Sequence, residues 1–202
     1  MDPMYLEWDG TEEVLEAMEE ALHDRARRAP EPTPPSPDPS LLVSDDALST
    51  LLPYFGCVIR RTAEGIELTG SGHPAMNAAA TTPEKFHAPF TVRVVAKTDS
   101  TNLRLYWHAG EIIFNWEVSE RELRVHDPAT GRQTGYPDRG FVEPGVFHEI
   151  VWTVDAGAMT IAVDAEQRYV GEGRYGHIEA PIGIGPCFGS TIVVRELEVS
   201  TR

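Results

Sequence analysis

The chain has 202 residues, of which 41% are hydrophobic and 24% are charged, close to the usage of ordinary globular proteins. Its formal charge is −15, which disfavours nucleic acid and anionic membranes as partners, because both bind clustered cations. No apolar run approaches the ~20 residues of a membrane-spanning helix, and Met1–Met4 shows neither the basic nor the apolar region of a secretory signal. We therefore expect a cytoplasmic protein.

The first predicted element is an acidic amphipathic helix within residues 1–29. Apolar residues recur there at helical spacing, at Val14, Leu15, Met18, Ala21 and Leu22. Residues 1–39 contain eleven acidic residues and three arginines, so they carry −8 of the total charge of −15. A short helix is marginal in water without packing, so its apolar stripe needs a partner. The following domain, a second copy of the chain and another protein all remain open as that partner.

A proline-rich linker, residues 30–40, follows the helix. Six of the sixteen prolines lie within the ten residues Pro30–Pro39. Because proline fixes φ and lacks an amide donor, this composition favours an extended polyproline spacer. A ligand for proline-recognising domains of the SH3 type is the alternative.

From residue 41 to residue 202 the pattern changes to the period of two that is typical of β-strands. The clearest alternation lies in Phe90–Lys97, Asn102–His108, Glu111–Glu117 and Glu122–His126. Further candidate strands are Val58–Arg60, Gly65–Leu68, His148–Asp155, Ala158–Asp164, Gln167–Gly171, Ile182–Gly185 and Ile192–Val199. Many short strands without an intervening helical pattern predict an all-β, two-layer antiparallel sandwich or barrel, because each sheet must cover its apolar face.

The C-terminal strands form a characteristic succession. It consists of a tryptophan-bearing strand, a hairpin, an Ile-Gly-Ile-Gly strand and a last alternating strand, at Phe147–Asp155, Ala158–Asp164, Pro181–Pro186 and Ile192–Val199. This succession resembles the concanavalin A-like lectin and glucanase superfamily, over about Phe55–Val199, although Ala165 replaces the usual hairpin glycine. The resemblance implies a two-sheet jelly-roll sandwich. It does not select a function, because the superfamily includes lectins, laminin G-like protein-binding modules, glycoside hydrolases and polysaccharide lyases.

The strands between residues 103 and 126 predict a sheet with one apolar and one polar face. Alternation turns Leu103, Leu105, Trp107 and Trp116 towards the core. The outward set is Arg104, Tyr106, His108, Asn115, Glu117, Arg124 and His126, with Arg93 and Lys97 on an adjoining strand. In a jelly roll this face would be the concave sheet, on which members of the superfamily bind glycans.

A sugar offers paired hydroxyls and an apolar ring face, so its pocket needs planar donors, acceptors and an aromatic platform. The outward set supplies these groups. We therefore predict a non-catalytic lectin-like module that binds a carbohydrate or another polar small ligand. Four cations, Arg93, Lys97, Arg104 and Arg124, make an anionic ligand such as an acidic sugar compatible with this face. An ordinary solvated sheet face is the competing interpretation.

Two further interpretations use the same residues. Glu117 with His108 or His126 could form the general acid/base pair of a glycoside hydrolase or a polysaccharide lyase, although the E-x-D-x-E motif of family 16 glycoside hydrolases is absent. The same three residues could form a two-histidine, one-carboxylate metal site. We expect no cofactor, with calcium as the alternative. Its candidate ligands are Asp99, Asn102, Asp127 and Asp138.

The remaining predictions concern the cysteines and the N-terminal region. Cys57 and Cys187 lack metal-type spacing, and we expect two buried free thiols. A third functional interpretation is a protein-interaction scaffold, in which the N-terminal helix binds a protein partner or forms a homodimer.

Overall fold

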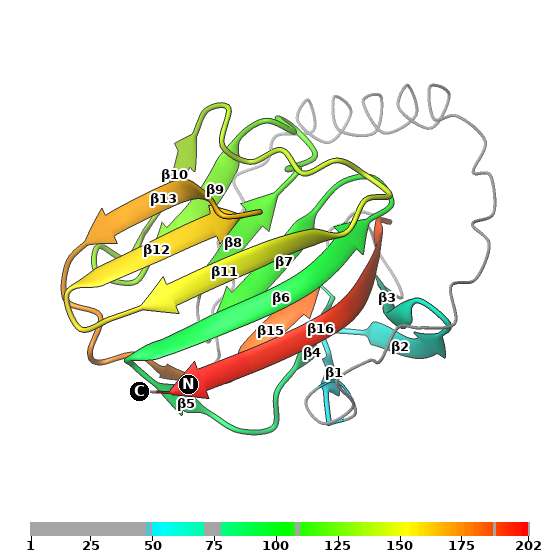
Figure 1. Ribbon diagram of the computed structural model, residues 1–202, viewed down its shortest axis with the longest axis horizontal. Helices are drawn as coiled ribbons and strands as arrows, with labels where there is room; N and C mark the ends of the chain where they lie inside the picture. Colours follow the sequence, from blue (N-terminus) through cyan, green and yellow to red (C-terminus); the bar gives the residue numbers. More distant parts are fainter. Residues whose placement is uncertain (1–47, 49, 71–77, 108–109, 188, 202) are drawn as a thin grey trace. The chain divides into compact units, whose positions relative to one another are not determined.

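The computed structural model describes residues 48, 50–70, 78–107, 110–187 and 189–201 (Figure 1). The described chain is all-β, as predicted, and forms two seven-stranded antiparallel sheets with a small two-stranded one. The predicted helix within residues 1–29 and the linker 30–40 lie outside the described residues. In the part of the chain that the structure describes, no helix is long and apolar enough to span a bilayer.

Sheet A and sheet B are the two layers of a sandwich, and sheet B lies in front in Figure 1. Sheet A has the order β1 (Leu52–Tyr54), β4 (Ala79–Thr81), β15 (Ile182–Gly185), β7 (Leu103–Trp107), β8 (Gly110–Phe114), β9 (Leu123–Asp127) and β10 (Arg132–Tyr136). Sheet B has the order β13 (Glu166–Glu172), β12 (Ala158–Val163), β11 (His148–Val154), β6 (Phe90–Thr98), β16 (Thr191–Thr201), β3 (Gly65–Gly70) and β2 (Cys57–Thr62). The small sheet pairs β5 (Phe86–His87) with β14 (Glu179–Ala180).

The core forms between the sheets because each strand buries alternate residues. In β6 every second residue is buried, from Phe90 to Thr98, and the Phe90 ring meets Trp152 of β11 edge-on at 5.4 Å. In sheet A, Leu105, Ile112 and Val125 lie opposite one another on β7, β8 and β9 and are fully buried. Trp107 also belongs to the core, as predicted. The period-two pattern therefore fixes which face of each strand turns inwards.

The edge of the sandwich where β10 faces β13 is closed by tyrosines around one carboxylate. Asp127 accepts hydrogen bonds from the hydroxyl groups of Tyr169 (3.0 Å) and Tyr175 (3.2 Å), which are both buried. Tyr136 of β10 meets the Tyr169 ring edge-on at 5.2 Å. A side chain at Gly171 would collide with the Tyr169 hydroxyl, so glycine leaves the space that these rings occupy. We call Asp127, Tyr136, Tyr169 and Tyr175 the edge cluster.

The edge cluster predicts a loss of stability at alkaline pH. Burial and the nearby Asp127 carboxylate raise the pKa of Tyr175 to about 12 and also raise the pKa of Tyr169. An unfolded tyrosine ionises near pH 10, so this stabilisation is complete below about pH 10 and is lost as the pH rises through about 12. Urea unfolding should show a free energy at least about 1 kcal/mol lower at about pH 11 than at about pH 8. An equal free energy of unfolding at both pH values would contradict the prediction. So would a Tyr175→Phe variant that loses as much stability between the two pH values as the unmodified chain.

Both cysteines are buried and unbridged, as predicted. Burial raises the pKa of the Cys57 thiol to about 11. The thiol is therefore protonated at neutral pH, which makes it a poor nucleophile and a poor metal ligand.

Candidate functional site

The face of sheet A that points away from sheet B gathers the polar side chains of β7, β8, β9 and β10. Arg104 lies opposite Ile113, which lies opposite Arg124, and His126 lies opposite Gln133. Cross-strand partners share a face, so these side chains all point away from the core. We call this surface the outer face.

A buried charge network lies at the centre of the outer face. The Arg104 guanidinium donates to Glu111 (Nη1 to Oε2, 3.1 Å) and to Glu117 (Nη2 to Oε2, 3.3 Å). Its Nε and Nη2 also donate to Asn102 Oδ1, at 3.0 and 2.6 Å. The side chains of Arg104, Glu111 and Glu117 are only 4%, 10% and 5% exposed. One cation and two carboxylates are thus held together away from bulk water.

Electrostatics keeps Arg104 ionised in this position. Burial by itself lowers the pKa of an arginine, but the Glu111 and Glu117 carboxylates outweigh that effect and raise the pKa of Arg104 above its usual value. Tyr106, the next outward residue on β7, is half-buried, but its hydroxyl group is shielded from solvent, and this burial raises the pKa of the hydroxyl well above the usual value. Both side chains therefore keep their ordinary charge at neutral pH.

The network is linked to partly exposed groups on β9 and β10. Glu117 Oε1 accepts the indole N–H of Trp116 at 3.0 Å, and Gln133 Nε2 donates to Glu111 Oε1 at 3.4 Å. The Arg124 guanidinium lies over the Trp116 ring, 3.9 Å from its centre. Trp116, Arg124, His126 and Gln133 are all partly accessible. We call these four residues the rim, because they border the buried network and can reach a ligand.

Two of the predicted orientations are wrong, and one residue explains both. Asn115 has a positive φ of 47°, which ends β8 and breaks its alternation. Trp116 consequently lies on the outer face with Arg124 instead of in the core. Asn115 itself is fully buried: its amide group donates to the Val142 carbonyl (2.7 Å) and accepts the Val142 N–H (2.8 Å). It anchors a loop and is not placed to bind a ligand.

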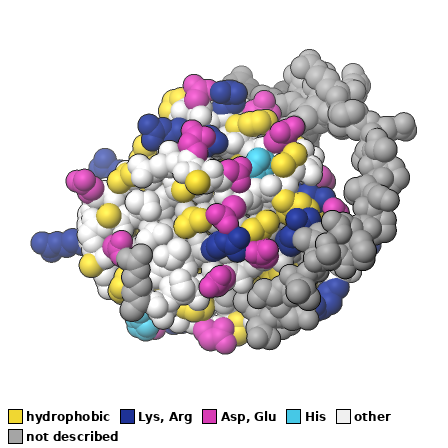
Figure 2. Space-filling model, viewed as in Figure 1, with side chains coloured by type: hydrophobic (Ala, Val, Ile, Leu, Met, Phe, Trp, Pro, Cys, Tyr) yellow, Lys and Arg dark blue, Asp and Glu magenta, His cyan; other side chains and the backbone are white. Residues whose placement is uncertain are grey.

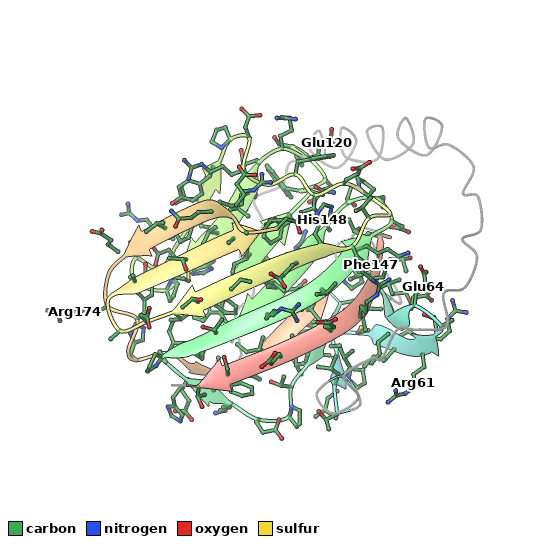
Figure 3. All side chains as sticks on the ribbon, in the orientation of Figure 1. Arg61, Glu64, Glu120, Phe147, His148 and Arg174 are labelled. Atoms are coloured by element: carbon green, nitrogen blue, oxygen red, sulfur yellow. The ribbon has the colours of Figure 1, made fainter. Side chains whose placement is uncertain are left out.

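The prediction that Arg93 and Lys97 adjoin this face is also wrong. Both belong to β6, which pairs with β11 and β16 in sheet B. Arg93 pairs there with Glu149 and Glu196. Lys97 pairs with Glu64 (2.9 Å) and lies 4.8 Å from the centre of the Phe147 ring. Glu64 and Phe147 are labelled in Figure 3. Figure 2 shows acidic and basic side chains interspersed on this side of the molecule. The cations predicted for one face are therefore divided between two opposite faces.

The outer face is not cationic as a consequence. Its two arginines, Arg104 and Arg124, are matched by Glu111, Glu117 and Glu122, of which Glu122 lies 3.6 Å from Arg124. An anionic ligand was judged compatible with this face because of four cations, and two of these, Arg93 and Lys97, lie on sheet B.

The described residues contain only part of the acid/base pair and of the metal site that were predicted from Glu117, His108 and His126. His108 lies outside the described residues, and the His126 ring meets Trp107 edge-on at 5.8 Å. Across the described ranges, no group of three or more His, Cys, Asp or Glu side chains is placed to hold a metal ion. The proposed calcium ligands have separate partners: Asp99 accepts the Thr191 N–H, Asn102 binds Arg104, Asp127 belongs to the edge cluster and Asp138 pairs with Arg121.

Three residues of this site were missing from the predicted set: Glu111, Trp116 and Gln133. Alternation along β8 places Glu111 outward, opposite Tyr106, so its place was visible in the sequence. Gln133 was not, because β10 reads Arg-Gln-Thr-Gly-Tyr and lacks an apolar alternation.

No family model and no curated protein matches this chain. Solved structures do match. A Bacillus subtilis protein of unknown function with a galectin-like fold has a TM-score of 0.61 at 10% identity, over 80% of this chain and 93% of that one. The Crh5 transglycosylase gives 0.60 at 13% identity, over 80% and 82%. The carbohydrate binding module CBM66 from Bacillus subtilis gives 0.52 at 9% identity, over 75% and 96%. At these identities the likeness shows the fold alone, which is the two-sheet jelly-roll sandwich that the sequence pattern predicted.

Proposed function

We propose that this chain is a non-catalytic carbohydrate-binding module whose ligand lies on the outer face of sheet A, over the rim. The observation that carries the proposal is the buried Arg104 network beneath partly exposed planar side chains. Buried ion networks are costly to desolvate, and an ordinary solvated sheet face needs none. The similar solved structures, which include a carbohydrate binding module and a transglycosylase, support the ligand class.

The rim offers the chemistry that a saccharide requires. The stacked Arg124 and Trp116 form a flat platform for a sugar ring, and the Gln133 amide both donates and accepts. The buried network holds Glu117 and Glu111, and these hold the Trp116 indole and the Gln133 amide in place. Groups fixed before binding lose little entropy when the ligand arrives. Because three glutamates offset two arginines, we expect a neutral saccharide here.

The hydrogen bonds favour binding over catalysis. Glycoside cleavage needs one carboxyl group that can donate a proton to the leaving oxygen. Glu117 accepts hydrogen bonds from Arg104 and Trp116, and Glu111 accepts them from Arg104 and Gln133. Neither carboxyl group faces the site as a donor. A hydrolase or lyase that uses Glu117 with His108 or His126 is the alternative, and it predicts turnover that Glu117→Gln abolishes.

A thermal-shift panel of neutral cello-, malto-, manno- and galacto-oligosaccharides tests the proposal, because a ligand of the native state raises the melting temperature. For the strongest hit, titration calorimetry should show that Arg124→Ala weakens binding about tenfold, the loss expected for one stacking and hydrogen-bonding contact. The control is Arg60→Ala, since Arg60 is exposed on β2 of the other sheet and should leave the affinity unchanged. Oligosaccharide breakdown that is lost in Glu117→Gln would establish the enzyme instead, and no hit in the panel would overturn the proposal.

The cytoplasmic location and the partner of the N-terminal helix, whether a second copy or another protein, stay predictions.

A further inference from the structure

A cleft of about 460 Å³ lies at the sandwich edge that the edge cluster closes. Its lining consists of Asp127, Thr130, Arg132, Thr134 and Tyr136, all from the β9–β10 hairpin. Thr134 lies opposite the buried Val125 and Tyr136 lies opposite Leu123, so these side chains point towards the inside of the sandwich. Arg124, His126 and Gln133 of the same hairpin point the other way. The cleft is therefore separate from the outer face.

Asp127, which lines the cleft, belongs to a prearranged polar cluster. Asp127 accepts hydrogen bonds from the Tyr169 and Tyr175 hydroxyl groups and, through its other oxygen, from the Ala129 N–H at 2.8 Å. Three neutral donors thus surround one carboxylate, which satisfies most of its acceptor capacity and stabilises its negative charge. The edge-on packing of Tyr136 against Tyr169 holds the wall in position. The cleft is formed before any ligand arrives.

Arg132 is the charged group of the cleft that is left for a ligand. It is exposed, and in the described part of the chain no carboxylate lies within ion-pair distance of its guanidinium. The Thr130 and Thr134 side chains add two hydroxyl groups, and Tyr136 adds an aromatic wall. A guanidinium binds a carboxylate with two parallel hydrogen bonds, hydroxyl groups pair with hydroxyl groups, and an aromatic ring covers an apolar sugar face.

From this set we infer that the cleft is a second ligand site, selective for a sugar unit that bears a carboxylate, such as a uronic acid. The volume falls in the range of about 300–1,000 Å³ that is usual for small-molecule sites. Arg132 holds the carboxylate, the two threonines bind ring hydroxyl groups and Tyr136 packs against the ring. The inference does not depend on the function proposed for the outer face, and it makes the hairpin a two-sided binding element.

The test is a titration of the full chain with D-glucuronic acid, with D-glucose as the matched neutral probe. Backbone amide NMR should show shifts at residues 130–136 with glucuronic acid and weaker or no shifts there with glucose. Arg132→Ala should raise the dissociation constant for glucuronic acid at least about tenfold, because it removes a charge-assisted bidentate contact. Arg60→Ala, on β2 at the far edge of sheet B from β13, is the matched control and should leave the constant unchanged.

Three outcomes overturn the inference. Equal affinity for glucose and glucuronic acid would show that the cleft does not recognise the carboxylate. An unchanged constant in Arg132→Ala, with weakening in Arg124→Ala instead, places the ligand on the outer face. Absence of amide shifts at residues 130–136 with millimolar glucuronic acid would show that the cleft is not a binding site. Binding on the outer face is tested independently by the panel of neutral saccharides.

Discussion

Replacement of Arg104 by methionine is expected to lower the free energy of unfolding by about 3–5 kcal/mol, the usual cost of removing one partner from a buried charge network. The substitution leaves Glu111 and Glu117 buried without their shared cation, and it removes the donors to Asn102. Urea unfolding followed by far-UV circular dichroism measures the loss. We also expect oligosaccharide affinity to fall in this variant, because the network positions the rim.

Two controls separate the charge network from loss of arginine packing. Arg60→Met removes an arginine paired with Glu67 on the surface, where its side chain is 69% exposed, and should cost at most about 1 kcal/mol. The triple variant Arg104→Met, Glu111→Gln, Glu117→Gln removes the stranded charges and should recover part of the stability. A loss below about 1 kcal/mol for Arg104→Met alone would mean that the network is not desolvated as described.

Replacement of Asp127 by alanine is expected to cost about 2–6 kcal/mol, because two buried tyrosine hydroxyl groups each lose their acceptor at about 1–3 kcal/mol. Asp127→Asn keeps acceptor oxygen at the same place and should cost less. Asp138→Ala is the matched control, since Asp138 is 71% exposed and pairs with Arg121 at the surface. The measurement is again urea unfolding. Equal losses for the alanine and asparagine variants, or a loss no larger than that of Asp138→Ala, would show that the edge cluster does not stabilise this side of the sandwich.

The sequence predicts the inward and outward faces of the long strands because alternation is a local property. β6 alternates over its whole length and β11 alternates from Glu149 onwards, and Trp107 lies in the core where the pattern places it. The pattern fails after β8, because Asn115 adopts a left-handed conformation that no neighbouring residue announces. Trp116 is turned to the outer face by that single residue.

Strand pairing was less predictable, because it joins segments that are distant in the sequence. Arg93 precedes Arg104 by only eleven positions, yet β6 and β7 lie in different sheets. The neighbours of β6 are β11 and β16, which come much later in the chain. The sequence therefore indicates which residues point outward: Arg104, Tyr106, Glu111, Glu117, Arg124 and His126. The place of Gln133 beside Glu111 depends on the register of the sheet.

The most direct test of ligand binding on the outer face is an amide and indole NMR titration of the labelled full chain with the oligosaccharide that raises the melting temperature most. The Trp116 indole N–H, which donates to Glu117 beneath the rim, is the reporter. We predict that this signal shifts in a saturable way, together with the amides of Arg124, His126 and Gln133. Shifts confined to the strands of sheet B, with the Trp116 indole signal unmoved at saturation, would contradict the assignment.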